Sequence, residues 1–501
     1  MNKKRVSILA IFLAVMIVMG TAFGGRLISK ASSANSNSKV EKVNNETRKS
    51  LKEKITEKKI KKKTYNVAKY FYKKKYNKIR ALISDMIINS SETDTNDEIT
   101  GNITESITGN TLDDVTGDTQ VENISLRDLY TNDVLEEYYL MYFGCNSFVR
   151  YDEYVCEKNG EYYCTTLTIY GKVRILHVNL VFDSDLDVVK MTFITSPLAE
   201  QSSDFTETNI VLGDYQLEGL LTLPTNNAKP PVVILVHGSG YHNADESIGS
   251  NRIFAEIAHS LAKQGIATVR YNERFHQYPG LIYSNNTVYT EAIDDACSIV
   301  KQISKDSRVD NSRIYVVGHS LGGMVAPKIA ELCPEVTGIV SMAGSPRKLV
   351  DICYDQSYLM YQLLNISKEE KDAFWAEQLK LFEIIRNAND SDEIVGGYSN
   401  KYWKSSNELN VEESLNKLNI PMLILQGKDD LQVYADKDFV EWQRILKGRN
   451  NCTFKLYEGL NHDFMKSNGY TILDVNKEHF SPGHVEQRVL DDMAEFINKN
   501  K

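Results

Sequence analysis

The strongest constraint on the fold is an alternation of short apolar runs and amphipathic segments, which begins near Phe205 in this chain of 501 residues. Pro231–Val236 is apolar throughout, as in strands covered on both faces, and a helical pattern follows at Ile253–Gln264. Strands alternating with helices predict a doubly wound, mostly parallel sheet of the α/β class over residues 205–501. The further expected strands are Ile266–Tyr271, Ser312–Val317, Val336–Met342, Ile420–Gln426 and Cys452–Tyr457, and the further expected helices are Thr290–Ser304, Met324–Leu332 and Val485–Asn498.

One long segment interrupts this alternation. Arg347–Leu418 has helical patterns and no run suited to a core strand. Because such a segment has to lie outside the sheet, we expect residues 347–418 to form a helical cap over its carboxyl edge. The aromatic residues of the cap either wall an apolar pocket or pack the cap onto the sheet, and both readings stay open. These residues are Tyr354, Tyr358, Tyr361, Phe374 and Trp375.

A different pattern precedes Ser196–Asp204, a polar segment that is expected to separate two domains. Val67–Ile88 has apolar residues at helical spacing, Leu126–Tyr142 has short helical patterns, and residues 90–123 are too polar to build a core. Alternating segments with turn residues between them then predict an antiparallel sheet. Residues 65–195 are therefore expected to form a small α+β domain of cone-like shape with a disordered insertion at 90–123. The expected strands are Phe148–Cys156, Tyr162–Tyr170, Val173–Phe182 and Val188–Ile194.

Residues 1–34 have the pattern of an export signal. Asn2–Arg5 is basic, Val6–Phe23 is almost wholly apolar, and small residues suitable for cleavage follow. A cleaved signal peptide and an uncleaved anchor are both compatible with this pattern. Either one predicts an extracytoplasmic protein, secreted or tethered to the outer face of the membrane.

The next segment, residues 35–64, is expected to be a basic tether, with a helical stretch near Leu51–Ile60 as one reading of its middle. Residues 35–80 contain 17 Lys and Arg against 4 Asp and Glu, although the whole chain has a net charge of −9. A solvated segment is the simplest interpretation of such an arm, and contact with anionic cell-envelope polymers is the functional one. The absence of aromatic residues between its first lysines argues against nucleic-acid binding.

The cysteines do not indicate a metal or redox site. The chain has seven of them, which is odd and sparse, and no pair has zinc-site spacing. An Asn159-Gly160 turn would pair Cys156 with Tyr163 and place Cys164 on the opposite face, so both thiols are expected to be free. Since no nucleotide-binding loop is present either, the sequence implies no metal and no cofactor.

The first chemical motif is Gly318-His319-Ser320-Leu321-Gly322, between an expected strand and an expected helix. Attack on a carbonyl carbon needs an exposed hydroxyl in a strained turn, and small neighbours let that turn form. G-x-S-x-G alone is a weak signal. Its position after a strand and before a helix predicts that Ser320 is a nucleophile, with an ordinary glycine-rich turn as the alternative.

The second motif, His237-Gly238-Ser239-Gly240, follows the strand Val232–Val236. The tetrahedral intermediate of acyl transfer carries a negative oxygen, and N–H groups have to point at it beforehand. We expect these oxyanion-hole donors to be Ser239 and Leu321, the residue after the nucleophile. A simple glycine turn is the alternative for the second motif.

A carboxylate and an imidazole follow the last two expected strands. In Gly427-Lys428-Asp429-Asp430-Leu431-Gln432-Val433, we expect Asp430 to orient the imidazole and Asp429 to be a solvated loop acid. Of nine histidines, only His462 lies in the loop after the last expected strand. Neutral imidazole can accept the serine proton near pH 7. Along the chain, the nucleophile Ser320 comes first, the acid Asp430 second and the base His462 third. Among the folds that carry such a triad, this order is typical of one.

These motifs resemble the α/β-hydrolase superfamily over about residues 205–500, especially the bacterial serine esterases and serine aminopeptidase-like hydrolases. That branch often has H-G-S-G-P followed by D-R-D-E. Here Tyr241 replaces the proline, Asn243-Ala244 replace D-R, and Asp245-Glu246 match. The R-Y-D-K-R of the branch is Arg270-Tyr271-Asn272-Glu273-Arg274 in this chain. The changes leave the triad intact and alter the rim of the pocket.

The resemblance implies a serine hydrolase that cleaves a carboxylic ester through an acyl-enzyme intermediate, with a small-molecule ester or short acyl compound as its substrate. Serine aminopeptidase and thioesterase activities of the same fold are the alternatives. A non-catalytic binding protein is a third one, against which the intact triad argues. Residues 65–195 are similar in pattern to the nuclear transport factor 2-like domains fused ahead of bacterial hydrolases.

Overall fold

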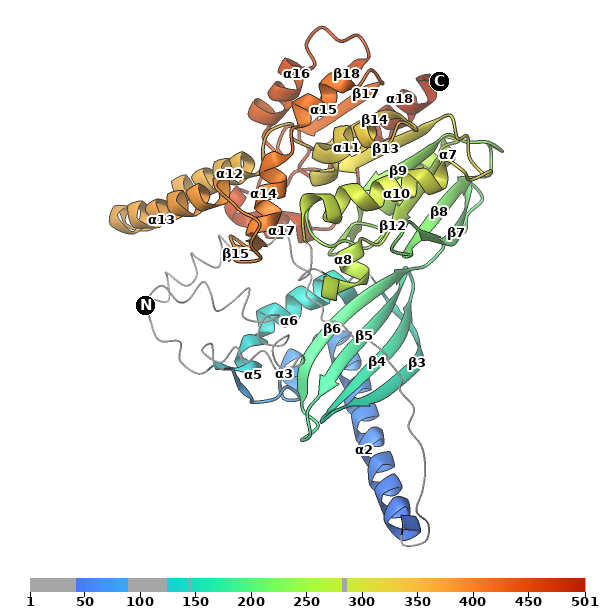
Figure 1. Ribbon diagram of the computed structural model, residues 1–501, viewed down its shortest axis with the longest axis vertical. Coiled ribbons are helices and arrows are strands. Elements are labelled where there is room, and N and C mark those ends of the chain that lie inside the picture. Colours follow the sequence, from blue (N-terminus) through green and yellow to red (C-terminus); the bar gives the residue numbers. More distant parts are fainter. Residues whose placement is uncertain (1–41, 89–123, 145, 282–285, 501) are drawn as a thin grey trace. The chain divides into compact units, whose positions relative to one another are not determined.

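The computed structural model describes residues 42–88, 124–144, 146–281 and 286–500 (Figure 1). The predicted signal or anchor at 1–34 and the predicted insertion at 90–123 lie outside the described residues. The described residues form two compact units, which divide between Thr195 and Ser196. None of the described helices is long and apolar enough to cross a membrane.

The smaller unit contains a four-stranded antiparallel sheet in the order β3-β4-β5-β6. Side chains alternate along its strands, so that Leu176, Val178 and Leu180 of β5 enter one apolar core. Val67 and Phe71 of helix α2 belong to the same core, and α2 packs against β4 and β5. The elements are α2 (Lys42–Phe71), α3 (Tyr76–Arg80), β1 (Ile87–Ile88), β2 (Ile124–Ser125), α5 (Leu126–Leu129), α6 (Asn132–Tyr138), η1 (Tyr139–Phe143), β3 (Phe148–Asn159), β4 (Tyr162–Gly171), β5 (Arg174–Phe182) and β6 (Val188–Pro197).

Helix α2 differs from the helix that the sequence predicts. It spans Lys42–Phe71, so the predicted helix Val67–Ile88 is wrong in both its start and its end. The helix runs without a break through residue 64, where the basic tether was expected to end. Ile60 and Thr64 are fully buried, and Val67 and Phe71 continue the same face at intervals of three and four residues. The many lysines between these positions conceal the apolar stripe in the sequence.

The larger unit is built on an eight-stranded sheet in the order β18-β17-β14-β13-β9-β12-β8-β7. Neighbouring strands are parallel from β18 to β12, and β8 pairs antiparallel with β12 and β7. The predicted fold class, a mostly parallel α/β sheet, is confirmed, whereas the β7–β8 hairpin is an addition to it. The strands are β7 (Phe205–Leu212), β8 (Leu217–Pro224), β9 (Val232–Val236), β12 (Ala267–Tyr271), β13 (Ile314–His319), β14 (Val336–Met342), β17 (Met422–Gly427) and β18 (Cys452–Tyr457).

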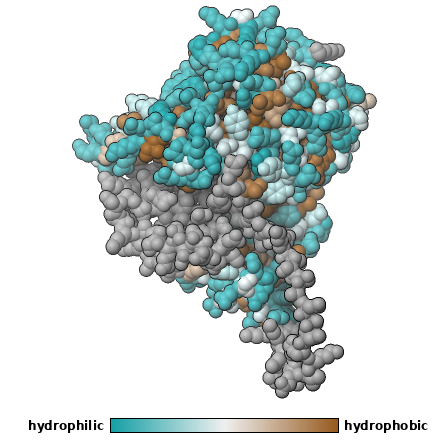
Figure 2. All heavy atoms as spheres, viewed as in Figure 1, coloured by the Kyte–Doolittle hydropathy of each residue, from teal (hydrophilic) through white to brown (hydrophobic). Residues whose placement is uncertain are grey.

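Helices cover both faces of this sheet. In β9, Val232, Ile234 and Val236 enter one core, and Val233 and Leu235 enter another, because successive side chains of a strand point to opposite faces. The first core includes side chains from α10 (Asp294–Ile303) and α11 (Leu321–Leu332), and the second includes side chains from α7 (Ile253–Lys263) and α18 (Gln487–Lys499). The apolar residues are thus inside, and the face seen in Figure 2 is mainly hydrophilic.

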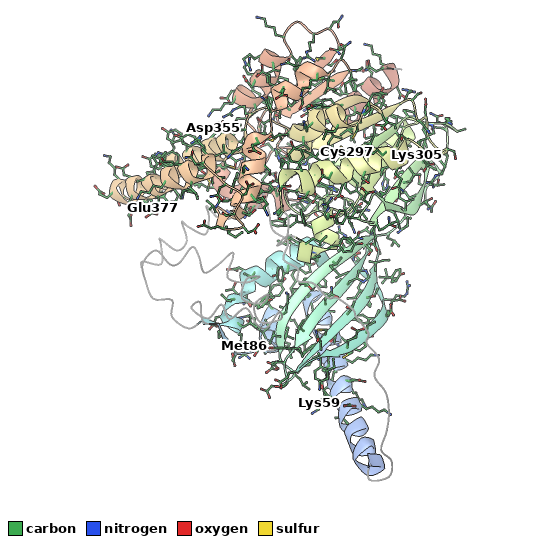
Figure 3. The ribbon with its side chains drawn as sticks, in the orientation of Figure 1. Lys59, Met86, Cys297, Lys305, Asp355 and Glu377 are labelled. Atoms are coloured by element: carbon green, nitrogen blue, oxygen red, sulfur yellow. The ribbon has the colours of Figure 1, made fainter. Side chains whose placement is uncertain are left out.

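The segment between β14 and β17 contributes four helices and a two-stranded hairpin, β15–β16, but no strand of the large sheet. Helices α12 and α13 project from the sheet, where Asp355 and Glu377 mark them (Figure 3). Tyr402 and Trp403 of α14 are buried in the core that contains α11. The elements are α12 (Leu349–Leu363), α13 (Lys368–Arg386), β15 (Ile394–Val395), β16 (Tyr398–Ser399), α14 (Asn400–Glu408) and α15 (Val411–Lys417).

Aromatic residues join the two projecting helices to each other. The ring of Trp375 in α13 lies 5.4, 5.2 and 5.2 Å from the rings of Tyr354, Tyr358 and Tyr361 in α12, measured between centroids. Edge and tilted contacts at these distances are typical of aromatic packing. These contacts join α12 to α13, and Tyr354 also packs against the core that contains α10 and α11.

Candidate active site

Ser320 lies in the turn between β13 and α11. Its φ of 51° and ψ of −114° lie outside the regions that residues with a side chain normally occupy. The Ser320 N–H donates to the carbonyl oxygen of Met342 at 2.8 Å, which fixes the turn to the end of β14. Ser320 is partly exposed, whereas His319 and Leu321 on either side are buried. This strained and accessible turn has the geometry of a nucleophilic serine.

Two glycines allow this turn to close. A Cβ atom on Gly318 would lie 2.1 Å from the carbonyl group of Gly322, and one on Gly322 would lie 2.1 Å from the carbonyl oxygen of Val236 in β9. Atoms that are not bonded cannot approach so closely. Helix α11 therefore reaches the sheet at this point only because both positions lack a side chain.

The loop after β9 brings backbone N–H groups to the serine. A Cβ atom built on Gly238 would lie 3.2 Å from the Cβ of Ser320, so the loop passes directly beside it. Ser239 is buried in this loop, and Leu321 is the first residue of α11. In the part of the chain that the structure describes, the N–H groups of Ser239 and Leu321 have no acceptor. Both donors are thus available to an oxyanion.

His462 and Asp430 form a buried pair. His462 Nδ1 lies 2.8 Å from Asp430 Oδ2, and the two residues are 3% and 6% exposed. Asp430 follows β17 and His462 follows β18, and these parallel neighbours deliver both side chains to the carboxyl edge of the sheet. With Nδ1 bound to the carboxylate, Nε2 is the nitrogen that can accept a proton from a serine hydroxyl.

Three further donors hold Asp430. The N–H groups of Gln432 and Val433 donate to its Oδ1 at 2.8 and 3.0 Å. The side-chain amide of Gln426 donates to its Oδ2 at 2.9 Å. Asp429, in contrast, is exposed to solvent. The structure therefore brings Asp430, and not its neighbour, to the imidazole.

His319 connects this pair to the nucleophile turn. Its Nε2 lies 3.1 Å from the carbonyl oxygen of His462, and the two imidazole centroids are 5.0 Å apart. Its Nδ1 lies 3.1 Å from Oε1 of the buried Glu246. Burial works to lower the pKa of His319, but Glu246 outweighs burial and raises that pKa to about 9. The Glu246 carboxylate therefore favours the charged form of His319, immediately before Ser320.

Several buried acids beside the site are not among the residues that the sequence predicts. Glu246, Glu273 and Glu291 are at most 2% exposed. Glu246 matches the end of the D-R-D-E segment of the resembling branch, Glu273 stands where that branch has a lysine, and Glu291 has no sequence signal. Asp463 pairs with His479, whose Nδ1 lies 2.9 Å from Asp463 Oδ2. Among the described residues, no group of three or more His, Cys, Asp and Glu is arranged to hold a metal ion.

Comparison with known proteins adds to this geometry. Residues 228–365 match the family described as Hydrolase_4, serine aminopeptidase, S33. The matched range contains Ser239, Ser320 and Leu321 and spans the strands β9 to β14 at the centre of the sheet. The larger unit has the α/β-hydrolase fold. We refer to residues 196–500 as the hydrolase unit.

One similar protein of recorded activity is Esterase EstD from Thermotoga maritima. It is 36% identical to this chain over 283 residues, which are 56% of this chain and 66% of that protein. The chain thus covers slightly less than two thirds of the length of this relative.

Similar solved structures include Est1E from Butyrivibrio proteoclasticus and the esterase PF2001 from Pyrococcus furiosus. Est1E is 19% identical, with a TM-score of 0.37, over 59% of this chain and 100% of its own. The Pyrococcus furiosus esterase is 14% identical, with a TM-score of 0.38, over 61% of this chain and 96% of its own.

Proposed function

We propose that the hydrolase unit is a carboxylesterase-type serine hydrolase that cleaves small-molecule esters through an acyl-enzyme intermediate. The observation that carries this proposal is the buried His462–Asp430 pair, 2.8 Å between Nδ1 and Oδ2, beside the strained turn of Ser320. The identity of 36% to an esterase favours an ester over other acyl substrates.

In the proposed reaction, Ser320 Oγ attacks the carbonyl carbon of the ester while His462 Nε2 takes the hydroxyl proton. Asp430 holds the His462 ring in the required tautomer and stabilises the imidazolium ion. The N–H groups of Ser239 and Leu321 bind the oxyanion, and one such donor is typically worth about 3–4 kcal/mol in the transition state. His462 then protonates the departing alcohol, and a water molecule activated by the same ring releases the acid.

A series of p-nitrophenyl esters of increasing acyl length tests this proposal. We expect turnover by the wild-type protein and a loss of about four to six orders of magnitude in kcat for Ser320→Ala, because the triad acts as a unit. Thermal unfolding of the variant serves as the control for folding. Absence of turnover for every ester, or a variant that keeps a tenth of the wild-type rate, contradicts the proposal.

Serine aminopeptidase activity is the second candidate, because the family description names it. The same triad can cleave an amide, and the leaving amine then takes the proton from His462. Aminoacyl p-nitroanilides and p-nitrophenyl esters with the same acyl group separate the two activities. A higher kcat/KM for the anilides would overturn the assignment to esters.

We also propose that the chain acts outside the cytoplasm, secreted or tethered to the membrane, because residues 1–34 combine a basic start with an apolar run. The basic residues of 35–64 would then face the anionic polymers of the cell envelope. Fractionation of expressing cells and N-terminal sequencing of the mature protein test the location.

For the smaller unit we propose a nuclear transport factor 2-like domain, supported by helix α2 on a four-stranded antiparallel sheet.

A further inference from the structure

Three buried glutamates hold the loop that follows β9. Alternate N–H groups of this loop each donate to a different carboxyl group, and each carboxyl group comes from a different position in the chain. The three bonds run from Gly238 to Glu246 Oε1 at 2.6 Å, from Gly240 to Glu291 Oε1 at 2.9 Å, and from His242 to Glu273 Oε2 at 2.6 Å.

The N–H of Ser239 lies between two of these bonded groups. It has no acceptor within the described residues, although Gly238 and Gly240 on either side are both bound. Because the neighbouring peptide groups are fixed, the direction of the Ser239 N–H is set before a substrate arrives. Oxyanion stabilisation depends on donors that are aimed in advance and need no reorganisation during the reaction.

The three glutamates connect the loop to different parts of the hydrolase unit. Glu246 ends the loop itself in a left-handed conformation, with φ of 46°. Glu273 follows β12, and its own N–H donates to the carbonyl oxygen of His242 at 3.0 Å. Glu291 lies in the helical segment η3 (Tyr289–Ile293). The loop is therefore held by the sheet and by a helix as well as by its own turns.

If all three glutamates were ionised, their negative charges would repel the oxyanion that the loop has to bind. Burial raises the pKa of Glu291 to about 7 and that of Glu273 well above its usual range, so both carboxyl groups hold their proton more tightly than an ordinary glutamate does. Burial also works to raise the pKa of Glu246, but the charge of His319 outweighs burial and lowers it. Glu246 and His319 then form an ion pair of no net charge, 3.1 Å apart. A neutral carboxyl group still accepts an N–H through its carbonyl oxygen.

We propose that Glu246, Glu273 and Glu291 are positioning residues that aim the Ser239 N–H at the oxyanion formed on Ser320. This inference rests on the proposed esterase function. The glutamates act through the loop and are not assigned any contact with the substrate. The loss of one glutamate is therefore expected to slow the chemical step while substrate binding changes little.

Glu291 allows the sharpest test, because a matched pair of variants separates the acceptor from the rest of the side chain. Glu291→Gln keeps an oxygen for the Gly240 N–H, whereas Glu291→Leu has similar size and no acceptor. With a p-nitrophenyl ester, we expect the Gln variant to keep kcat within about threefold of wild type. The Leu variant is expected to lose about 10- to 100-fold in kcat with KM nearly unchanged, which is somewhat less than the loss from deleting a donor outright.

A trifluoromethyl ketone provides a second readout that a merely structural role would not move. Ser320 Oγ adds to its carbonyl carbon, the serine proton passes to His462, and the carbonyl oxygen becomes a hemiketal oxyanion. We expect its inhibition constant to rise in Glu291→Leu by the factor by which kcat/KM falls, and to stay unchanged in Glu291→Gln. Thermal unfolding checks each variant. If Glu291→Leu does not fold, Glu291→Asp, whose carboxyl group is one methylene shorter, takes its place with the same expectation.

The possible failures are distinguishable. A folded Glu291→Leu or Glu291→Asp variant with wild-type kcat and inhibition constant overturns the inference, and so does a loss confined to KM. Equal losses in Glu291→Gln and Glu291→Leu also overturn it, because they would show that the acceptor is not what matters. A wild-type protein that neither cleaves esters nor reacts with the ketone overturns the proposed function and this inference with it.

Discussion

At the scale of single residues, the adjacent aspartates Asp429 and Asp430 have the same side chain and differ only in their surroundings. Asp430 is buried against His462 and accepts three further N–H bonds, two of them from the backbone, whereas Asp429 is exposed. In Asp430→Asn the amide cannot stabilise the imidazolium ion and favours the wrong tautomer, so we expect a loss in kcat on the order of 10⁴-fold. Asp429→Asn is the matched control and is expected to stay within about twofold, as surface substitutions usually do. Steady-state ester hydrolysis measures both, and equal losses or the reverse order would contradict the assignment of Asp430.

Burial of Glu291 makes the stability of the hydrolase unit depend on pH. Burial raises the pKa of Glu291 to about 7 in the folded state, from 4.5 for an ordinary glutamate. The folded state thus binds the proton more tightly, so this contribution to stability is fully present below pH 4.5 and is lost as the pH rises through 7. Glu291→Gln does not titrate. Its stability relative to wild type is therefore expected to rise by roughly 2–3 kcal/mol between pH 5 and pH 8.

Chemical denaturation of Glu291→Gln and wild type at both pH values measures this difference. Other titrating groups are common to the two proteins and cancel in the comparison. A difference in stability that does not change with pH would show that Glu291 titrates in its ordinary range.

The sequence marks some of these residues and not others for a physical reason. Ser320 and Asp430 follow apolar strands and His462 follows the edge strand β18, and a local pattern at each position is enough to find them. Glu273 and Glu291 matter because of N–H groups that lie 31 and 51 positions away in the chain. Such pairings depend on how strands and helices pack, which no local pattern contains.

At the scale of elements, helix α11 can pack directly against strand β9 because position 322 is a glycine. In Gly322→Ala the new methyl group would lie 2.1 Å from the carbonyl oxygen of Val236, a backbone atom that cannot move away by itself. We expect this variant to lose about 3 kcal/mol or more in stability, as overpacked cores do. In the matched variant Gly323→Ala the new methyl group would lie 2.8 Å from the hydroxyl of Ser341 and 3.0 and 3.1 Å from backbone atoms of Gly318 and Gly344, so every contact is longer than the closest one at Gly322. A smaller loss is expected there, and equal unfolding temperatures for the two variants would contradict this account of the turn.

The inner parallel strands follow directly from the sequence, because they are buried on both faces and their apolar runs are continuous. The edge strand β18 was also expected, whereas β7, β8 and the lysine-rich helix α2 were not found with their observed bounds. Strand β7 at the edge has buried and exposed residues in mixed order, and helix α2 has its apolar face among lysines. Both were outside the expected elements or misplaced among them.

The β3–β4 hairpin shows how a register can be wrong while its consequence holds. Gly160, at φ of 59°, takes the first position of the turn, so Cys156 pairs with Thr165 and not with Tyr163 as predicted. The shift is two residues, which keeps every side chain on its face because the strand repeat is two. Cys156 and Cys164 are both free, as expected.

At the scale of the whole chain, all groups assigned to ester cleavage lie in residues 196–501. A fragment should begin at Ser196, because Glu200 pairs with Arg252 at 2.7 Å and its N–H donates to Glu207 at 2.9 Å. We expect fragment 196–501 to fold and to keep kcat for a small ester within about threefold of the full chain, since domains of this size usually fold alone. Circular dichroism and turnover of the purified fragment are the measurements. A folded fragment without activity would show that the smaller unit completes the site.

The positions of the three proposed triad residues along the chain also set when the proposed activity can begin during synthesis. Strands β9 and β13 at the centre of the large sheet are made before β17 and β18, which form one edge. Ser320 therefore leaves the ribosome well ahead of Asp430 and His462, and spends the early life of the nascent chain without a base. Hydrolysis has to wait until the last strands and α18 have emerged and packed. Under the proposed function, a polypeptide still being made is thus catalytically silent, and a chain that ends before His462 lacks the proposed base.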